Sequence, residues 1–505
     1  MDSCKTQDAH RRRNPQQKRS QTKLLQYQKM LRAALKTKKK MAVQFMVQSR
    51  RGLAVLSFGD GSHGALGLPT SLMGIGVDAY EPTKVLSLPS DIDAVSAGHY
   101  HSLAVTSQGQ LWAWGRDLEA QLGRGRSSPR DSWNEPKRVI GLEQVRVKAA
   151  FASGVVSAAI GDDGSLWTWG KSKRGQLGLG KEVIEAVVPS KVEALAREKI
   201  AKVTFGWGHA LAQTEDGKLF GWGYSADGRL GSIAGTLETS PLESSATENN
   251  KLSSSTLEAA EKLVLEGVEK EKNRPIIWEP RLVKELHGVH VLDIACGLDH
   301  SLILCGDGTL LSCGSNAYGQ LGRVKQDLGM FPVDISFHLT SVASGLGHSL
   351  AICRVSLSDD SKGDPTSIVS WGWNQSSQLG RVGPESTLMK VKALEGETPV
   401  SVSGGRVHSI ALTSSGEVWV WGCGKNGRLG LGSSIDEAEP VLLYPLEDYE
   451  VLQVVSDPAA SLSSSLPSTT LPPPSDPPRR CRTFLYRHHQ YDSFFLLSSV
   501  VADLC

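Results

Sequence analysis

Five histidines recur at equivalent places along the chain, and they are the first residues whose chemistry has to be considered. Each stands three residues after a glycine; they are His101, His209, His300, His348 and His408. Imidazole rings bind metals and transfer protons near neutral pH, so a repeated set of them raises the question of a metal site. A structural zinc site requires mixed ligands at short spacing, however, and the chain contains no CxxC pair. We therefore expect the histidines to form hydrogen bonds inside their own repeats, and we assign no metal-binding residue.

The chain also lacks the motifs of common catalytic and nucleotide sites. It contains no P-loop, no HExxH and no GxSxG sequence. Adjacent carboxylates such as Asp162 and Asp163 stand beside a turn glycine, where Asp is favoured for backbone reasons. We therefore predict that the chain is not an enzyme, with no catalytic residue, no cofactor-binding residue and no cofactor.

Tryptophan follows a repeated pattern of its own. Nine tryptophans lie in, or just after, short apolar runs that end at a repeated glycine: Trp112, Trp114, Trp167, Trp169, Trp222, Trp371, Trp373, Trp419 and Trp421. Because alternate residues of a strand point to one face of a sheet, we expect these rings to pack between neighbouring repeats.

The elements that must position these side chains are defined by pairs of glycines. Two glycines stand eight residues apart in seven places: Gly59 and Gly67, Gly115 and Gly123, Gly170 and Gly178, Gly223 and Gly231, Gly314 and Gly322, Gly372 and Gly380, Gly422 and Gly430. A period of this kind predicts structural units that bury their apolar faces on one another.

One repeat contains enough residues for about four short strands. In residues 95–123, the runs 102–106 and 110–114 flank a turn at Gly109, and Pro136 then precedes another apolar run. Four-stranded sheets repeated around an axis form a β-propeller. The spacing therefore predicts an all-β fold of four-stranded blades.

The motifs GxxHSLAL, DGxLWxWG and GQLG resemble the repeats of the regulator of chromosome condensation family. The likeness covers residues 53–456, and it implies a seven-bladed propeller in which late residues complete the first blade and close the ring. It also implies a protein-binding scaffold as the function. Two alternatives from the same family are a guanine nucleotide exchange factor for a small GTPase, and a chromatin-associated protein that uses a basic tail.

A plant branch of this family senses ultraviolet-B light through tryptophans in repeated GlyTrpArgHisThr motifs. This chain approximates that motif once, at residues 206–209, and the functional residues that carry over are Trp207 and His209 alone. Glycine occupies position 208 in place of arginine. The sequence therefore does not favour photoreception.

Three segments are expected to depart from the ring. Residues 1–50 form a basic tail in which leucines at positions 24, 25, 31 and 35 indicate an amphipathic helix, and residues 232–275 form a Ser/Glu-rich insertion with one helix. The repeats stop at Ser456, and we interpret residues 457–505 as a Pro/Ser-rich, low-complexity product of alternative splicing or of the gene model. The propeller would then span residues 51–456, between disordered tails, and would lack its closing half unless another segment supplies it.

The copy that ends at Gly170 has Val156 where the histidine is expected, so a function that needs every histidine is not favoured.

Charge and composition limit the partners and the compartment. The chain has 505 residues and a net charge of +2, yet residues 1–40 carry thirteen Lys and Arg against two Asp. Such a tail could bind chromatin or nucleic acid, an acidic membrane or an import receptor, or it could be a solvated arm without a partner. The eight cysteines form no disulfide pattern, and no apolar run approaches the ~20 residues of a membrane span. We expect the cytoplasm or the nucleus, with organelle targeting by the basic N-terminus as the alternative; the oligomeric state is left open.

Overall fold

The computed structural model describes residues 53–69, 76–125, 132–231, 275–323, 329–355, 365–446 and 449–456, together with the backbone of one strand at 493–499. The chain divides into two compact units, Met1–Arg51 and Gly52–Cys505, and every described residue belongs to the second. The predicted basic tail, the helix predicted within 232–275 and most of the predicted C-terminal tail lie outside the described residues. Within those residues the regular structure is β-strand, with short 3₁₀ turns and no α-helix.

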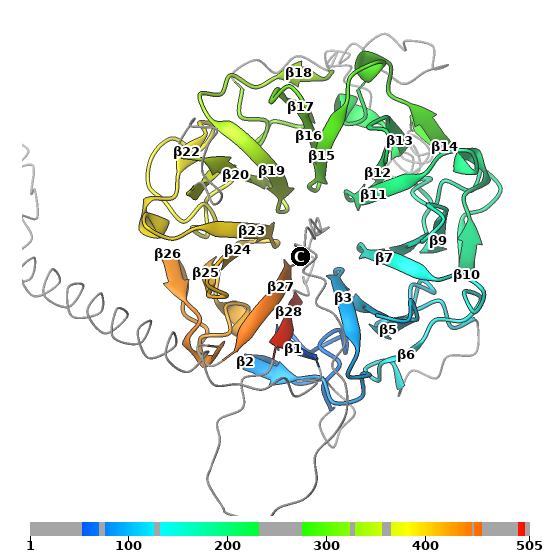
Figure 1. The fold of residues 1–505 in the computed structure, drawn as a ribbon, viewed down its shortest axis with the longest axis horizontal. Helices are drawn as coiled ribbons and strands as arrows, with labels where there is room; N and C mark the ends of the chain where they lie inside the picture. The colour runs from blue at the N-terminus through cyan, green and yellow to red at the C-terminus, as the bar shows by residue number, and fades with distance from the viewer. Residues whose placement is uncertain are drawn as a thin grey trace, which may run out of the picture. The chain divides into compact units, whose positions relative to one another are not determined.

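Six blades are each built from four consecutive antiparallel strands, as the repeats predict. The inner strands, which surround the centre in Figure 1, are β3 (Ile92–Ala97), β7 (Val147–Ala152), β11 (Ile200–Phe205), β15 (Val291–Cys296), β19 (His338–Ser344) and β23 (Pro399–Gly404). The second strands are β4 (His101–Thr106), β8 (Val156–Gly161), β12 (His209–Thr214), β16 (His300–Cys305), β20 (His348–Arg354) and β24 (His408–Thr413).

The third strands carry the repeated tryptophans, and the outer strands begin after the second glycine of each pair. The third strands are β5 (Leu111–Gly115), β9 (Leu166–Lys171), β13 (Leu219–Tyr224), β17 (Leu310–Gly314), β21 (Thr366–Gly372) and β25 (Val418–Gly422). The outer strands are β6 (Lys137–Arg138), β10 (Glu185–Lys191), β14 (Ile276–Leu282), β18 (Phe331–Pro332), β22 (Met389–Lys390) and β26 (Glu437–Leu442). We number these blades 1 to 6 in chain order.

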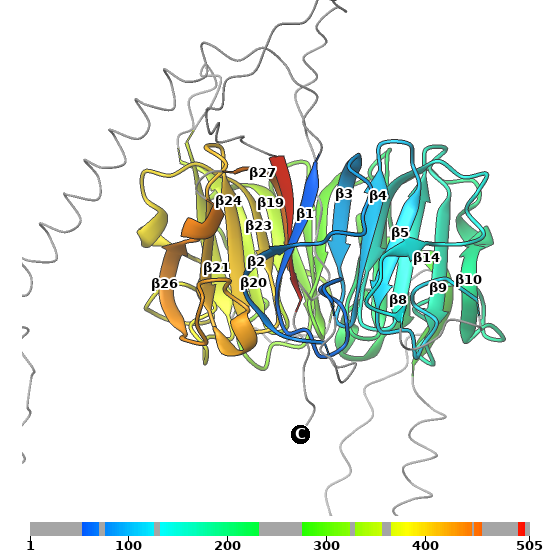
Figure 2. The ribbon, with the colours of Figure 1, turned by 90° about the horizontal axis from the view of Figure 1, so that it is seen from below.

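The remaining sheet is a composite of early and late segments, in the order β2 (Ala79–Lys84), β1 (Ala54–Gly59), β28 (Ser493–Ser499) and β27 (Glu450–Ser456). β28 runs parallel to both of its neighbours, whereas the second strand of every other blade is antiparallel to its neighbours. Figure 2 shows β28 in red beside β1 in blue.

The prediction of seven uniform blades is therefore corrected to six regular blades and one composite sheet. The physical reason is that no GxxHS half follows Ser456 in the chain. A segment without the repeat motif, residues 493–499, occupies the place of the second strand instead.

The composite sheet closes the ring through its inner strand. β27 contacts β23 of blade 6 on one side and β3 of blade 1 on the other. The Gln453 side-chain amide accepts a hydrogen bond from the Val95 N–H at 3.1 Å and donates one to the Val95 carbonyl at 3.1 Å. The Gln453 side chain thus bonds to both backbone groups of Val95 and links the inner strand of the composite sheet to that of blade 1.

Buried tryptophans hold neighbouring blades together, as the sequence predicts. Five indole rings are fully buried, and each Nε1–H donates to a backbone carbonyl of the preceding blade or sheet: Trp114 to Ala65 at 2.9 Å, Trp169 to Gln121 at 2.9 Å, Trp222 to Gln176 at 2.8 Å, Trp371 to Gln320 at 2.9 Å and Trp421 to Gln378 at 2.8 Å.

The second glycine of each pair makes room for this contact. At Gly123, where φ is +62°, a Cβ atom would lie 2.9 Å from Trp169 Nε1 and 2.9 Å from Val139. Any other residue at this position would therefore be strained and would also displace the indole.

Blade 4 replaces the tryptophan with a cysteine at the same position. The buried Cys313 thiol donates to the Arg229 carbonyl at 3.4 Å. Burial raises the pKa of Cys313 to about 12, so the thiol stays protonated and remains a donor. The five cysteines of the described residues are free thiols, and all but Cys423 are buried.

Removal of β28 should destabilise the ring. Truncation after Ser456 leaves the facing edges of β1 and β27 without their shared strand, and each lost backbone hydrogen bond contributes about 0.5–1.5 kcal/mol net. We expect the truncated chain to unfold at a clearly lower temperature and to aggregate more readily than a control truncated after Ser499. Equal melting temperatures by circular dichroism would show that β28 contributes nothing to closure.

Candidate interaction face of the ring

The five repeated histidines occupy the first position of the second strand in blades 1, 3, 4, 5 and 6, and all are buried. In blades 3 to 6, the glycine three residues before the histidine is required because the imidazole packs closely against it. At Gly206, for example, a Cβ atom would lie 2.0 Å from His209 Cε1. In the GxxH motif, the imidazole therefore packs against the backbone of the glycine, in the space that a side chain would fill.

Four of the five histidines bond to a serine of the next blade, not to a group in their own repeat as we predicted. The Nε2–Oγ distances are 2.7 Å for His101 and Ser157, 3.0 Å for His209 and Ser301, 3.1 Å for His300 and Ser349, and 3.0 Å for His348 and Ser409. These serines donate in turn to backbone carbonyls, as Ser157 does to Gln121 at 2.7 Å. The serine oxygen is thus left to accept the imidazole N–H.

The repeat that has Val156 in place of the histidine faces a blade that lacks the matching serine. Val156 occupies the histidine position of blade 2, and the residue at the matching serine position of blade 3 is Ala210. Both are fully buried. Replacement of both partners by apolar residues leaves no buried donor unsatisfied, whereas replacement of one would. The joint between blades 2 and 3 is an apolar version of the same contact.

Burial keeps the histidines neutral. It lowers the pKa values of His101, His300, His348 and His408 to about 3, and nearby arginines or histidines act in the same direction. The pKa of His209 is lowered well below 6.5 for the same reasons. These imidazoles are hydrogen-bonded packing groups, which is the structural role that the sequence predicts.

The paired replacement in blades 2 and 3 predicts the outcome of a double-mutant cycle. S157A should cost about 1–3 kcal/mol, because it leaves the buried His101 N–H without its acceptor. H101V combined with S157A should cost less than the sum of the two single substitutions, by about 0.5–3 kcal/mol. Urea unfolding of the four proteins measures this coupling, and strictly additive effects would contradict the proposed contact.

The histidines also predict how stability depends on pH. Their folded pKa values lie below the ordinary value of 6.5, so between pH 6.5 and about 3 the unfolded chain binds more protons than the folded ring. The free energy of unfolding must therefore decrease as the pH falls through this window, by up to about 1.4 kcal/mol per pH unit for each imidazole. Urea midpoints from pH 7 to pH 5 should show a shallower slope for the H101V/S157A variant, and an unchanged slope would contradict this origin.

One face of the ring collects two kinds of loop from every blade, and we call it the loop face. It contains the loops between inner and second strands, such as residues 98–100 and 206–208, and the connections that follow the third strands, such as residues 116–120 and 171–175. Backbone hydrogen bonds join the two sets: Arg116 N–H donates to the Tyr100 carbonyl at 2.7 Å, and Tyr224 N–H donates to the Gly208 carbonyl at 2.8 Å.

The loop face presents a recurrent group of side chains at the joints between blades. The residue just before the histidine lies between the first loop residue of its own third strand and a loop residue of the preceding blade. In blade 1 this residue is Tyr100, with Arg116 4.0 Å above its ring and the His63 ring 5.2 Å away. These positions vary from blade to blade, so each joint has its own chemistry.

At the joint between blades 2 and 3, a glycine lets an arginine cross onto a tryptophan. A Cβ atom at Gly208 would lie 2.8 Å from Arg174 Cδ, so only glycine leaves this path open. The Arg174 guanidinium lies 3.4 Å from the centre of the Trp207 ring. Trp207 is still 52% exposed, which makes it the largest aromatic surface available on this face.

At the joint between blades 4 and 5, a second glycine allows two aromatic rings to stack. Tyr318 and Trp373 lie 5.3 Å apart between ring centres, and both approach Gly347. The intervening joint between blades 3 and 4 is ionic. There the buried Arg229 guanidinium bonds to Asp227 at 2.7 Å and to Asp299 at 2.6 Å. The face thus alternates aromatic and charged positions.

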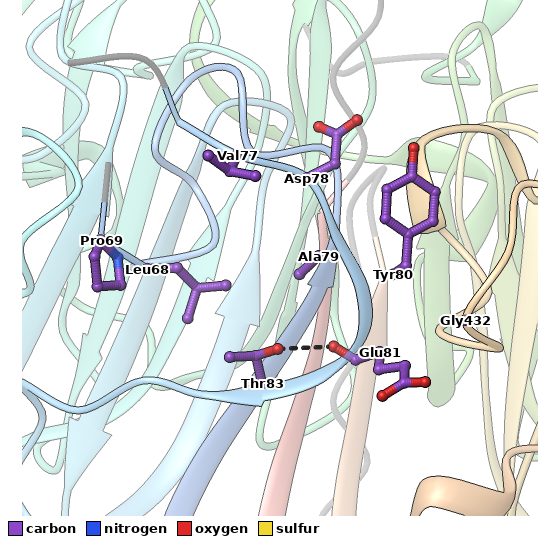
Figure 3. A pocket seen from close by; sticks show the side chains of 9 residues that line it. All are labelled: Leu68, Pro69, Val77, Asp78, Ala79, Tyr80, Glu81, Thr83 and Gly432. Carbon is purple, nitrogen blue, oxygen red and sulfur yellow. Dashed lines mark hydrogen bonds between the residues drawn. The ribbon is translucent and has the colours of Figure 1, made fainter. Parts of the chain in front are cut away.

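A shallow cavity of about 440 Å³ lies beside the outer strand β2 (Figure 3). The Asp78 carboxylate accepts a hydrogen bond from the Gly61 N–H at 3.0 Å, and burial raises the pKa of Asp78. The Thr83 hydroxyl donates to the Glu81 carbonyl instead of a carboxylate. The residues that line the cavity include no His, Ser or Cys, so the arrangement offers Asp78 no proton relay.

The described part of the chain contains no group of three or more His, Cys, Asp or Glu side chains arranged to hold a metal ion. Over the same ranges, no helix has the length and apolar character needed to cross a membrane.

Comparisons with known sequences agree with this architecture. The sequence profile of the RCC1-like domain matches residues 54–460. The ultraviolet-B receptor UVR8 of Arabidopsis thaliana is 28% identical over 404 residues, which is 78% of this chain and 78% of the receptor. The bovine secretion-regulating guanine nucleotide exchange factor is 31% identical over 60% of this chain and 61% of its own length. The human E3 ubiquitin-protein ligase HERC2 is 31% identical over 59% of this chain, but that match spans only 6% of HERC2.

Solved structures share the fold at low sequence identity. Prp20p from Saccharomyces cerevisiae, which was studied for its binding to Gsp1p and histones, has a TM-score of 0.59 and 24% identity, over 79% of this chain and 87% of Prp20p. Human WBSCR16 has a TM-score of 0.62 and 20% identity, over 81% of this chain and 98% of WBSCR16.

Proposed function

Because the chain belongs to the RCC1-like domain family, we propose that it is a non-enzymatic propeller scaffold that binds a protein partner on its loop face. The observation that carries this proposal is the exposed Trp207 ring held under Arg174. Tryptophan, tyrosine and arginine contribute most of the binding energy in protein interfaces. All three residue types occur at the joints of this face.

The joints also favour tight binding because their side chains are already ordered. Arg174 passes over Gly208, and the Tyr318 and Trp373 rings lie against Gly347. Side chains that are held in one arrangement before binding lose less conformational entropy when a partner arrives. The loop face therefore combines large aromatic surfaces with a low ordering cost.

Two alternatives draw on the comparisons. The bovine relative is named as a guanine nucleotide exchange factor, which supports exchange activity on a small GTPase as the second candidate. The binding of Prp20p to histones supports chromatin association as the third, and residues 1–40 would supply the positive charge for it. Residence in the cytoplasm or the nucleus fits each of the three, and it stays a prediction.

A matched pair of variants tests the scaffold proposal. W207A removes the exposed ring of the loop face, and F331A removes a partly exposed ring, 39% against 52%, from the outer strand β18. We expect quantitative affinity capture to lose a set of partners with W207A and to retain the same set with F331A, with a loss of about tenfold or more in affinity. Equal loss with both variants would reject the loop face as the site.

The same proteins separate the exchange-factor alternative. Small GTPases are loaded with fluorescent GDP and mixed with the chain. If the chain is a scaffold, a GTPase that binds it should release the nucleotide no faster than it does alone. Release that is accelerated by the wild-type chain and slowed by W207A would replace the scaffold proposal with exchange activity.

A further inference from the structure

Every inner strand of the ring carries a β-bulge at the same place near its beginning. The pairing with the second strand skips one residue in all seven sheets, between Ile92 and Ala94 in blade 1 and between Val291 and Asp293 in blade 4, for example. The seven extra residues are Asp93, Lys148, Ala201, Leu292, Thr340, Val400 and Leu452. A bulge redirects the side chain of its extra residue away from the regular sheet pattern.

These bulges lie at the face opposite to the loop face, which we call the turn face. The inner strands begin there, and the hairpin turns between second and third strands end there. Backbone hydrogen bonds tie three of the turns to the next inner strand: Val147 N–H donates to the Gly109 carbonyl at 3.0 Å, Ile200 N–H to the Gly164 carbonyl at 2.9 Å, and Val291 N–H to the Gly217 carbonyl at 2.9 Å. Over blades 1 to 4 the turn face is therefore a connected surface.

Several apolar side chains are exposed on the turn face. Three bulge residues are large exposed aliphatic side chains, with exposures of 47% for Leu292, 48% for Val400 and 39% for Leu452. Val289 and Tyr444 are also exposed beside the starts of inner strands β15 and β27. We call these five residues on blades 4 and 6 and the composite sheet the apolar arc. Large exposed apolar patches commonly mark a binding surface.

Another part of the turn face is acidic. Over blades 1 to 3, residues 91–93, 106–110, 143–148, 161–165, 193–199 and 214–218 contain nine Asp and Glu against five Lys and Arg. Lys148 pairs with Glu215 at 3.5 Å, and Lys218 pairs with Glu198 at 3.1 Å and with Asp216 at 3.0 Å. We call these segments the acidic arc; their net charge is negative after the pairs are counted.

We propose that the turn face binds a basic, amphipathic polypeptide segment of a partner protein. Its apolar side chains lie on the apolar arc, and its lysines or arginines face the acidic arc. This site is separate from the loop face, so it extends the scaffold to two partners. Charge complementarity argues against two other occupants, because a second copy of this ring would bring two acidic arcs together and nucleic acid would be repelled.

A synthetic amphipathic helix made of Leu and Lys, labelled with fluorescein, is the probe for this site. We expect fluorescence anisotropy to show binding to the full chain, and a matched helix with Glu in place of Lys to bind at least about tenfold more weakly. Equal binding of the two helices would overturn the proposal.

Two independent variants divide the site. L292D/V400D should weaken Lys-helix binding by about tenfold or more, and D93N/D162N should weaken it and reduce its dependence on salt. All four residues are exposed, so melting temperatures should stay close to wild type. If L292D/V400D fails to fold, D93N/D162N still tests the acidic arc. Unchanged affinity in both variants would overturn the proposal.

Loop-face binding separates this inference from the scaffold proposal. W207A should bind the Lys helix as well as wild type does, and D93N/D162N should retain the partners that W207A loses. If light scattering instead shows self-association that L292D/V400D abolishes, a second copy occupies the apolar arc and the partner-segment proposal is wrong.

Discussion

The ring depends on a buried carbonyl that accepts two hydrogen bonds from the next blade, an arrangement found at five of the joints between sheets. At Gln121 the donors are the Trp169 indole at 2.9 Å and the Ser157 hydroxyl at 2.7 Å. A carbonyl oxygen has two lone pairs, so both donors can be satisfied at once. In the buried joint an unsatisfied donor would cost about 1–3 kcal/mol, which explains why the residue types at these positions change together. Blade 4 keeps the arrangement with Cys313 and Ser301 on the Arg229 carbonyl.

The residues on the two faces of the ring can vary from blade to blade, whereas the buried residues at the joints between blades are fixed by packing. The tryptophan, the serine and the glycines are held by close packing, whereas the residue before each histidine and the extra residue of each bulge meet solvent or another loop. Tyr100, Gly208 and Gly347 occupy one such position in three blades, and they give three different surfaces. A rigid repeated core that carries variable surface positions is the arrangement expected of a scaffold.

Much of this core could be predicted from the repeat alone. The spacing of the glycines indicates four strands, and paired tryptophans indicate packing between repeats. The partner of a histidine cannot be predicted from one repeat, because the serine belongs to the next blade. The signal in the sequence is that the histidine and the matching serine are replaced together, by Val156 and Ala210. β28 carries no repeat motif, so its place in the sheet follows only from the backbone pairing. The stacking of Arg174 on Trp207 also depends on contacts between blades, which local patterns do not contain.

The composite sheet has a consequence for how the protein is made. In the sequence, β28 comes after all the other strands of the ring. In the sheet it lies between β27 and β1, and β1 is the first strand of the ring to be synthesised. Blades 1 to 6 can form one after another as the chain leaves the ribosome, since each is built from consecutive strands. One edge of β1 therefore lacks its partner until residues 493–499 have left the ribosome. During this interval the unpaired edge is open to pairing with another chain.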